Sequence, residues 1–153
     1  MGYDTILLRY GEIFLKGKNK GMFERKLVVN IRKIAIKEGI SKSAIIKSRG
    51  RLLMQYFPGH AALRHVFGLT SYSPSVRVEK NREEIQRKAV ELLQDRKGTF
   101  RIVTKRSDKT FPMTSIELNR IVGEHVEKET RLKFSPTSPD TILEIEINQE
   151  GTY

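Results

Sequence analysis

Residues Gly98 to Gly123 read GTFRIVTKRSDKTFPMTSIELNRIVG and combine a strand pattern, a basic loop and a helix start. The apolar and β-branched run Thr99 to Thr104 is typical of a short strand. Thr114 is followed three residues later by Glu117, and this spacing predicts a capping box at the start of a helix. The residues between these two elements therefore form a polar, cationic loop beside a helix N-terminus.

The side chains of this loop suit a nucleic acid. Lys105 and Arg106 end the predicted strand, and Lys109 and Phe111 follow in the loop. Helix N-termini favour anions, and an aromatic ring can stack on an unpaired base. We therefore expect the loop to bind a phosphate backbone and an unpaired base. A second interpretation, given equal weight, leaves the charges in water and places Phe111 in the core.

The distribution of charge supports a polyanionic partner. The chain has 153 residues and a formal net charge of +11. Residues 1–72 hold 14 Lys and Arg against 4 Asp and Glu, whereas residues 73–153 hold 15 against 14. One half is therefore strongly basic, which indicates a face for nucleic acid. A generally basic background is the alternative explanation.

Composition also excludes several classes of protein. The sequence contains no cysteine, which excludes disulfides, thiolate metal sites and cysteine nucleophiles. No apolar run approaches the ~20 residues of a membrane span, and the first residues lack a signal-peptide pattern. We therefore expect a cytoplasmic protein that does not enter a membrane.

The first half of the chain has the element order of a ferredoxin-like unit, which is strand–helix–strand–strand–helix–strand. The helix with the clearest apolar periodicity is Met22 to Glu38, whose apolar positions recur every three to four residues. The other predicted elements are the strands Tyr3–Tyr10, Ser43–Lys47, Arg51–Phe57 and Ser71–Val78 and the short helix Ala61–Phe67.

The second half alternates helices and strands. Asn81 is predicted to cap a helix, a second helix is predicted over Thr114–Leu132, and Thr141–Ile147 alternates like a half-buried strand. Residues 148–151 are predicted to form a hairpin turn before a further strand. The fold class is therefore α+β, a two-layer α/β arrangement. We expect domains at residues 1–76 and 77–153, the second lacking its final strand or strands.

The sequence contains no convincing active site. We find neither a Ser-His-Asp grouping in a recognisable context nor a cluster with metal-ligand spacing. His60, His65 and His125 are interpreted as surface or packing residues. We therefore predict no catalytic residue and no metal ligand in this chain.

Three motifs carry a family resemblance. The segment from Lys105-Arg106 through Phe111-Pro112 to Gly123 resembles the THUMP domain, an RNA-binding module of tRNA-modifying enzymes. The run Arg9–Asn19, followed by Phe23-Glu24, resembles the start of the tRNA 4-thiouridine synthetase (ThiI) family. Val66–Leu69 resembles the helix-to-strand junction of the same family. The likeness covers nearly the whole chain.

The resemblance implies a function for the chain as part of a larger enzyme. In that family a ferredoxin-like domain and a THUMP domain hold tRNA. A following pyrophosphatase-type domain uses ATP, with Mg, to activate a uridine for sulfur transfer. The Ser-Gly-Gly-x-Asp-Ser loop of that domain is missing from this sequence, as is any sulfur-carrying cysteine. We therefore expect no cofactor in this chain and no catalysis by this chain alone. The alternative is a stand-alone RNA-binding adaptor without catalysis.

The resemblance also implies partners and site residues. The partners are the acceptor stem and 3′ end of tRNA, the catalytic domain, a cysteine desulfurase or other sulfur donor and, in one form, a second copy of the chain. The family also has a link to thiamine biosynthesis. Lys105, Arg106 and Phe111 would engage the single-stranded acceptor end. The other residues expected to bind RNA are Arg9, Lys16, Lys18, Lys20, Lys109, Ser115 and Arg120, although Arg120 has the alternative of simply facing solvent.

Overall fold

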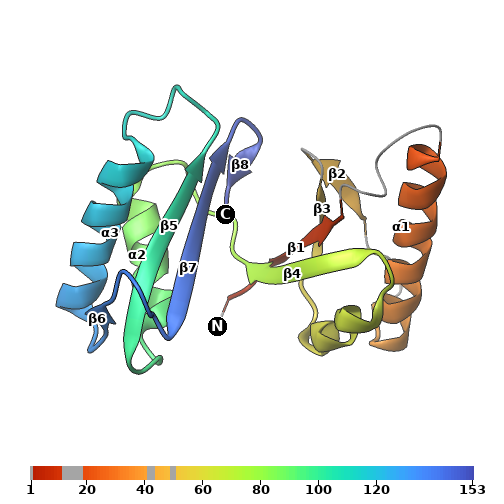
Figure 1. Ribbon diagram of the computed structural model, residues 1–153, viewed down its shortest axis with the longest axis horizontal. Coiled ribbons are helices and arrows are strands. Elements are labelled where there is room, and N and C mark those ends of the chain that lie inside the picture. Colours follow the sequence, from red (N-terminus) through yellow and green to blue (C-terminus); the bar gives the residue numbers. More distant parts are fainter. Residues whose placement is uncertain (1, 12–18, 41–43, 49–50) are drawn as a thin grey trace. The chain divides into compact units, whose positions relative to one another are not determined.

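The computed structural model describes residues 2–11, 19–40, 44–48 and 51–153 (Figure 1). The chain divides into two compact units, the N-terminal unit Gly2–Val76 and the C-terminal unit Arg77–Tyr153. Each unit has a four-stranded sheet and a hydrophobic core of its own. The helices and strands of both units confirm the α+β class, and the units are described separately below.

The sheet of the N-terminal unit has the strand order β2-β3-β1-β4, which is the ferredoxin-like order. Every neighbouring pair is antiparallel, and the central strand β1 places Leu7 opposite Leu53 on one side and Ser73 on the other. The strands are β1 Thr5–Tyr10, β2 Ile46–Ser48, β3 Arg51–Gln55 and β4 Leu69–Ser75.

Two helical elements pack against this sheet. Helix α1 spans Lys20–Lys37, and the second element, η2, is a 3₁₀-helix over Pro58–His65. The expected helix over residues 61–67 therefore begins three residues earlier, because Pro58 occupies its first turn, where a missing N–H costs no hydrogen bond. The predicted strand over residues 43–47 lies partly outside the described residues. Within the described residues, the observed strand β2 begins at Ile46.

The core of the N-terminal unit lies between β1 and α1. Alternate side chains of β1, including Ile6 and Leu8, are fully buried. Leu27 and Ile31 of α1 are buried in the same cluster, one helical turn apart. Side chains alternate between the two faces of a strand and recur every three to four residues on one face of a helix, so these four residues meet in one core.

The C-terminal unit has a mixed sheet with both helices on one face (Figure 1). Strand β5 runs parallel to β6 and β7, while β7 and β8 form an antiparallel hairpin, giving the order β6-β5-β7-β8. The elements are α2 Arg82–Leu93, β5 Thr99–Arg106, α3 Ser115–Glu129, β6 Lys133–Phe134, β7 Thr141–Asn148 and β8 Gly151–Thr152.

Short-range signals in the sequence set the ends of these elements. The side-chain oxygen of Asn81 accepts a hydrogen bond from the N–H of Glu84 at 2.9 Å, which confirms the predicted cap of α2. The capping box of Thr114 and Glu117 is also confirmed, with both hydrogen bonds at 3.1 Å. Helix α3 ends at Glu129, not at Leu132, because the Thr130 hydroxyl donates to the carbonyl of Val126 at 2.7 Å and closes the last turn.

The hairpin predicted at the end of the sequence is confirmed. The side-chain oxygen of Asn148 accepts hydrogen bonds from the N–H groups of Glu150, at 2.8 Å, and Gly151, at 3.0 Å. β8 then pairs with β7, and Thr152 also forms an isolated bridge with Val78. The hairpin thus ties the end of the sheet to the segment that precedes α2.

We expect Leu8→Ala to destabilise the N-terminal unit by about 2–5 kcal/mol, because it opens a cavity at the centre of the sheet. Val29→Ala, at a side chain that is 48% exposed, is the matched control and should change stability by less than about 0.5 kcal/mol. Urea unfolding measures the loss, and hydrogen exchange locates it. Equal stability of the two variants would contradict this placement of the core.

Candidate nucleic-acid interface

The loop of residues 107–114, between β5 and α3, lies at the carboxyl end of the parallel strands. The N–H groups of Ser107 and Asp108 both donate to the carbonyl of Ile147 on β7, at 2.9 Å and 3.2 Å. The N–H of Phe111 donates to the carbonyl of Asp108 at 3.4 Å, which closes a turn. The loop therefore leaves the sheet in a direction fixed by its neighbouring strand. Carboxyl ends of parallel strands are a common place for ligand sites.

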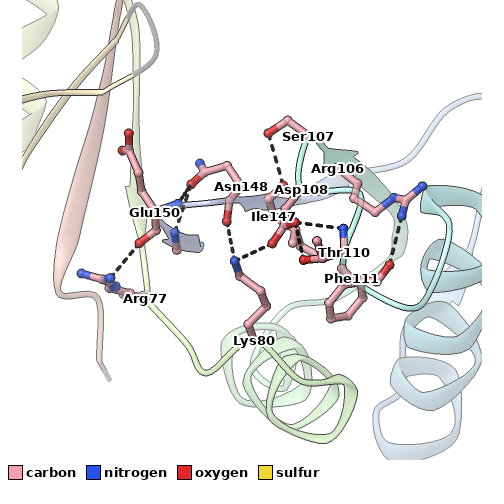
Figure 2. A network of polar contacts seen from close by, with 11 residues as sticks. Arg77, Lys80, Arg106, Ser107, Asp108, Thr110, Phe111, Ile147, Asn148 and Glu150 are labelled. Atoms are coloured by element: carbon pink, nitrogen blue, oxygen red, sulfur yellow. Dashed lines mark hydrogen bonds and ion pairs between the residues drawn. The ribbon is translucent and has the colours of Figure 1, made fainter.

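Asp108 is the centre of the polar network that holds the loop (Figure 2). Its carboxylate is buried and accepts hydrogen bonds from the Lys80 ammonium at 2.8 Å and from the N–H and hydroxyl of Thr110 at 3.0 Å and 2.6 Å. The Lys80 ammonium also donates to the carbonyl of Asn148 at 2.7 Å. These contacts join the segment before α2, the β5–α3 loop and the end of β7.

The same contacts set the ionisation of Asp108. The hydrogen bond from Lys80 and those from Thr110 hold the pKa of the Asp108 carboxyl well below its usual range. The carboxylate thus remains charged down to strongly acidic pH. Its negative charge offsets the positive charge of the Lys80 ammonium. Lys80 is therefore a structural cation and is not available to a polyanion in this arrangement.

Arg106 braces the loop from the other side. It is half-buried, and its Nη1 donates to the carbonyl of Phe111 at 3.0 Å (Figure 2). The guanidinium therefore holds the backbone at the position where the loop turns toward α3. Sequence reasoning assigned Arg106 to RNA, and the structure shows that it also has an internal role.

The structure corrects the expectation of an exposed ring at Phe111. The side chain is 4% exposed and belongs to the core cluster of the C-terminal unit, with Leu118 and Val122 of α3. Burial removes the apolar surface of an aromatic ring from water, which stabilises the fold. The second interpretation of the sequence, with Phe111 in the core, is therefore the one that the structure adopts, and a stacking role for the ring is not retained.

Two cations of the loop region extend into solvent. Lys105 is exposed at the end of β5, and Lys109 is exposed in the loop, where its ammonium reaches the carbonyl of Arg106 at 3.4 Å. Ser115 is half-buried in the first turn of α3. Arg120 is exposed and pairs with Glu124 one turn further along α3 at 3.5 Å, which agrees with a solvent-facing side chain.

The predicted phosphate contacts of the basic half are only partly covered by the structure. Lys16 and Lys18 lie outside the described residues. Arg9 is half-buried on β1, and its Nη1 donates to the Ser73 hydroxyl at 2.8 Å, so it contributes to the sheet. Lys20 is exposed in the first turn of α1.

Sequence reasoning missed one feature of the charged surface, the Lys80–Asp108–Asn148 network. Asp108 and Asn148 are 28 and 68 residues away from Lys80, and the three share no local motif. The cationic face of α1, in contrast, follows from the spacing of its basic residues, which lie off the apolar stripe of the sequence. They are Arg25, Lys26, Arg32, Lys33 and Lys37, and all five are exposed.

The donor set of the described residues does not fit a metal centre. No three His, Asp or Glu side chains among them lie close enough to share an ion. The ring of His60 contacts the rings of Tyr56, at a tilt, and Tyr72, edge-on, as expected of a packing residue. None of the helices that the structure describes has the length and apolar character needed to cross a membrane.

These features define an α+β protein in which a ferredoxin-like unit precedes a unit whose mixed sheet presents a basic loop. Residues 5–73 match the family model of the ThiI ferredoxin-like domain, and residues 79–153 match that of the THUMP domain. The chain therefore belongs to the ThiI family, of which it carries the ferredoxin-like and THUMP domains. The resemblance found in three sequence motifs is confirmed.

Relatives and solved structures agree with this assignment. A probable tRNA sulfurtransferase of Brevibacillus brevis is 38% identical over 162 residues, which is 100% of this chain and 40% of the relative. A crystal structure of a protein from Pyrococcus horikoshii Ot3 has a TM-score of 0.82 at 28% identity, covering 98% of this chain and 52% of that one. A 4-thiouridine synthetase in complex with RNA, with bound ATP, has a TM-score of 0.84 at 25% identity, covering 99% and 40%. The chain thus spans about 40% of the length of the curated relatives it matches.

We expect the acid stability of the C-terminal unit to depend on Asp108. A lowered pKa contributes stability that is fully present above the ordinary pKa of about 3.8 and is lost as the pH falls below it. Asp108→Asn should therefore lower the melting temperature at pH 7 and flatten its decline below pH 4. Asp95→Asn, at an exposed carboxylate after α2, is the control. Identical melting curves of the Asp108 variant and the parent at all pH values would refute the role of this network.

Phe111→Ala should cost about 3–5 kcal/mol of stability, because it removes a ring from the core. Ile116→Ala, at a side chain that is 81% exposed five residues further on, is the control and should cost less than about 0.5 kcal/mol. Thermal and urea unfolding measure both. An unchanged melting temperature for Phe111→Ala would contradict burial of the ring in the core.

Proposed function

We propose that this chain is the tRNA-binding portion of a tRNA 4-thiouridine synthetase-like enzyme. It holds the acceptor end of tRNA so that a separate ATP-dependent catalytic domain can thiolate a uridine. The observation that carries the proposal is the pair of exposed lysines before α3, Lys105 at the end of β5 and Lys109 in the β5–α3 loop. The sulfurtransferase relatives and the RNA-bound structural neighbour support the choice of tRNA as the ligand.

The loop has the properties needed to recognise a strand end. Because the backbone of the loop is fixed by Asp108 and Arg106, less backbone conformational entropy is lost when RNA binds. With Phe111 buried, we infer that the loop reads the strand end through its phosphates and not through stacking on this ring.

The N-terminal unit adds the larger share of positive charge. Residues 1–72 hold ten more basic than acidic side chains. Phosphates of the acceptor stem are the matching partner for four of these, with Arg9, Lys16, Lys18 and Lys20 as the proposed contacts. Electrostatic binding of this kind is sequence-independent and decreases steeply with salt.

Catalysis is assigned to the part of the longer protein beyond this chain. The sequence lacks the Ser-Gly-Gly-x-Asp-Ser loop, and the described residues do not fit a metal site, so ATP and Mg belong to the catalytic domain in this proposal. A cysteine desulfurase or other sulfur donor would supply the sulfur, and a homodimer is compatible with the scheme. The proposal places the protein in the cytoplasm, together with its tRNA.

We expect Lys105→Ala and Lys109→Ala each to lower the slope of log affinity for tRNA against log salt by up to about one, and the double variant by up to about two. Lys128→Ala, at an exposed lysine in the last turn of α3, should leave the slope unchanged. Binding is measured at several salt concentrations with intact tRNA and with tRNA trimmed of its 3′ single strand. The loop variants should affect only the intact tRNA. Equal binding of both tRNAs by the parent chain would rule out recognition of the end.

A further inference from the structure

The solvent face of α1 carries an apolar row that the core does not use. Met22, Val29 and Ile36 are 59%, 48% and 59% exposed and recur every seven residues. This spacing places them on one side of the helix. The opposite side packs into the core through Leu27 and Ile31. We name the row of Met22, Val29 and Ile36 the α1 stripe.

Cations border the α1 stripe along both edges. At 100° per residue, Arg25 and Arg32 fall on one side of the stripe, and Lys26, Lys33 and Lys37 fall on the other. All five side chains are exposed, and none forms an ion pair with any residue that the structure describes. This face therefore combines an apolar row with two rows of uncompensated positive charge.

The acidic residue of α1 does not neutralise this face. Glu24 is half-buried and accepts hydrogen bonds from the Lys47 ammonium at 3.0 Å and from the Tyr10 hydroxyl at 3.4 Å. Its charge is thereby directed toward the sheet of the same unit. The net charge of the solvent face is consequently that of its arginines and lysines.

The chemistry of the face selects among ligands. A nucleic acid would satisfy the cations but leave three large apolar side chains in water, and a second copy of α1 would bring like charges together. A membrane surface calls for a broad apolar face, whereas the other apolar residues of α1 are committed to the core. A helix with an apolar row flanked by carboxylates matches both the stripe and its borders.

We propose that the α1 stripe and its flanking cations dock an acidic amphipathic helix of a separate protein. The stripe runs over about two heptads, or roughly 21 Å of helix. A contact of this length is small, which suits a transient partner that is recruited and released. The cations speed the encounter and fix the orientation, while the apolar side chains provide most of the burial. This inference goes beyond the binding of tRNA and does not depend on it.

The probe is a synthetic helical peptide of about three heptads, with leucine at the seam positions a and d and glutamate at the flanking positions e and g. We expect it to bind the 153-residue chain, and the double variant Val29→Gln/Ile36→Gln to weaken the Kd at least about tenfold. Ile116→Gln replaces an even more exposed apolar residue, on α3, and is the control, with no effect on binding. Circular dichroism checks that each variant keeps its helices.

Charge reversal tests the borders of the stripe. Arg25→Glu/Arg32→Glu should weaken binding of the glutamate peptide and strengthen binding of a peptide with lysine in place of glutamate. A scrambled acidic peptide of the same composition should bind the parent at least about tenfold more weakly than the helical one. Equal binding of the scrambled and helical peptides, or none of either, would overturn the proposal.

Two further measurements separate the competing ligands. Binding to anionic phospholipid vesicles that is lost in Val29→Gln/Ile36→Gln would identify a membrane surface and overturn the proposal. A loss of tRNA affinity in this variant equal to the loss of peptide affinity would assign the stripe to RNA, with the same consequence. Unchanged tRNA affinity together with weakened peptide binding supports a protein partner.

Discussion

The architecture around the basic loop depends on one buried carboxylate, that of Asp108. A buried charge is costly unless it is paired and hydrogen-bonded, and three donors from Lys80 and Thr110 meet this requirement. Because Lys80 also binds the carbonyl of Asn148, the same cation ties the end of β7 to the segment before α2. Three stretches that are distant in sequence thus share one electrostatic anchor, and the path of the loop follows from it.

The anchor divides the cations of the loop region into two groups. Lys80 and Arg106 are committed to internal partners and hold the backbone. Lys105 and Lys109 remain exposed at the surface that the backbone creates. Phe111 also has an internal role, because its ring is buried in the core beneath the loop. The internal contacts make the backbone rigid, and the exposed lysines supply the charge for a ligand. The two are complementary, because a preorganised site loses less conformational entropy when it binds a ligand.

The N-terminal unit uses α1 in a comparable way, with one face for folding and one for recognition. Leu27, Ile31 and Ala35 of α1 are buried in the core of the unit. The opposite face of the helix does not contribute to that core. That face carries arginines and lysines beside an apolar row that includes Val29. Part of the positive charge of the first half of the sequence therefore lies beside an apolar row on one helix face. An anionic partner that matches this face has apolar side chains as well as negative charges.

The sequence by itself determined the features that depend on neighbours in the chain. Residues a few positions apart interact directly, so the caps at Asn81 and Thr114, the hairpin turn at Asn148 and the ferredoxin-like order of elements were predictable. Burial and pairing over long separations were decided only by the tertiary structure. An exposed and a buried Phe111 have the same local sequence, and the 28 residues between Lys80 and Asp108 carry no signal of their contact. The fold alone determines which side chains meet in a dry interior and which cations remain in water.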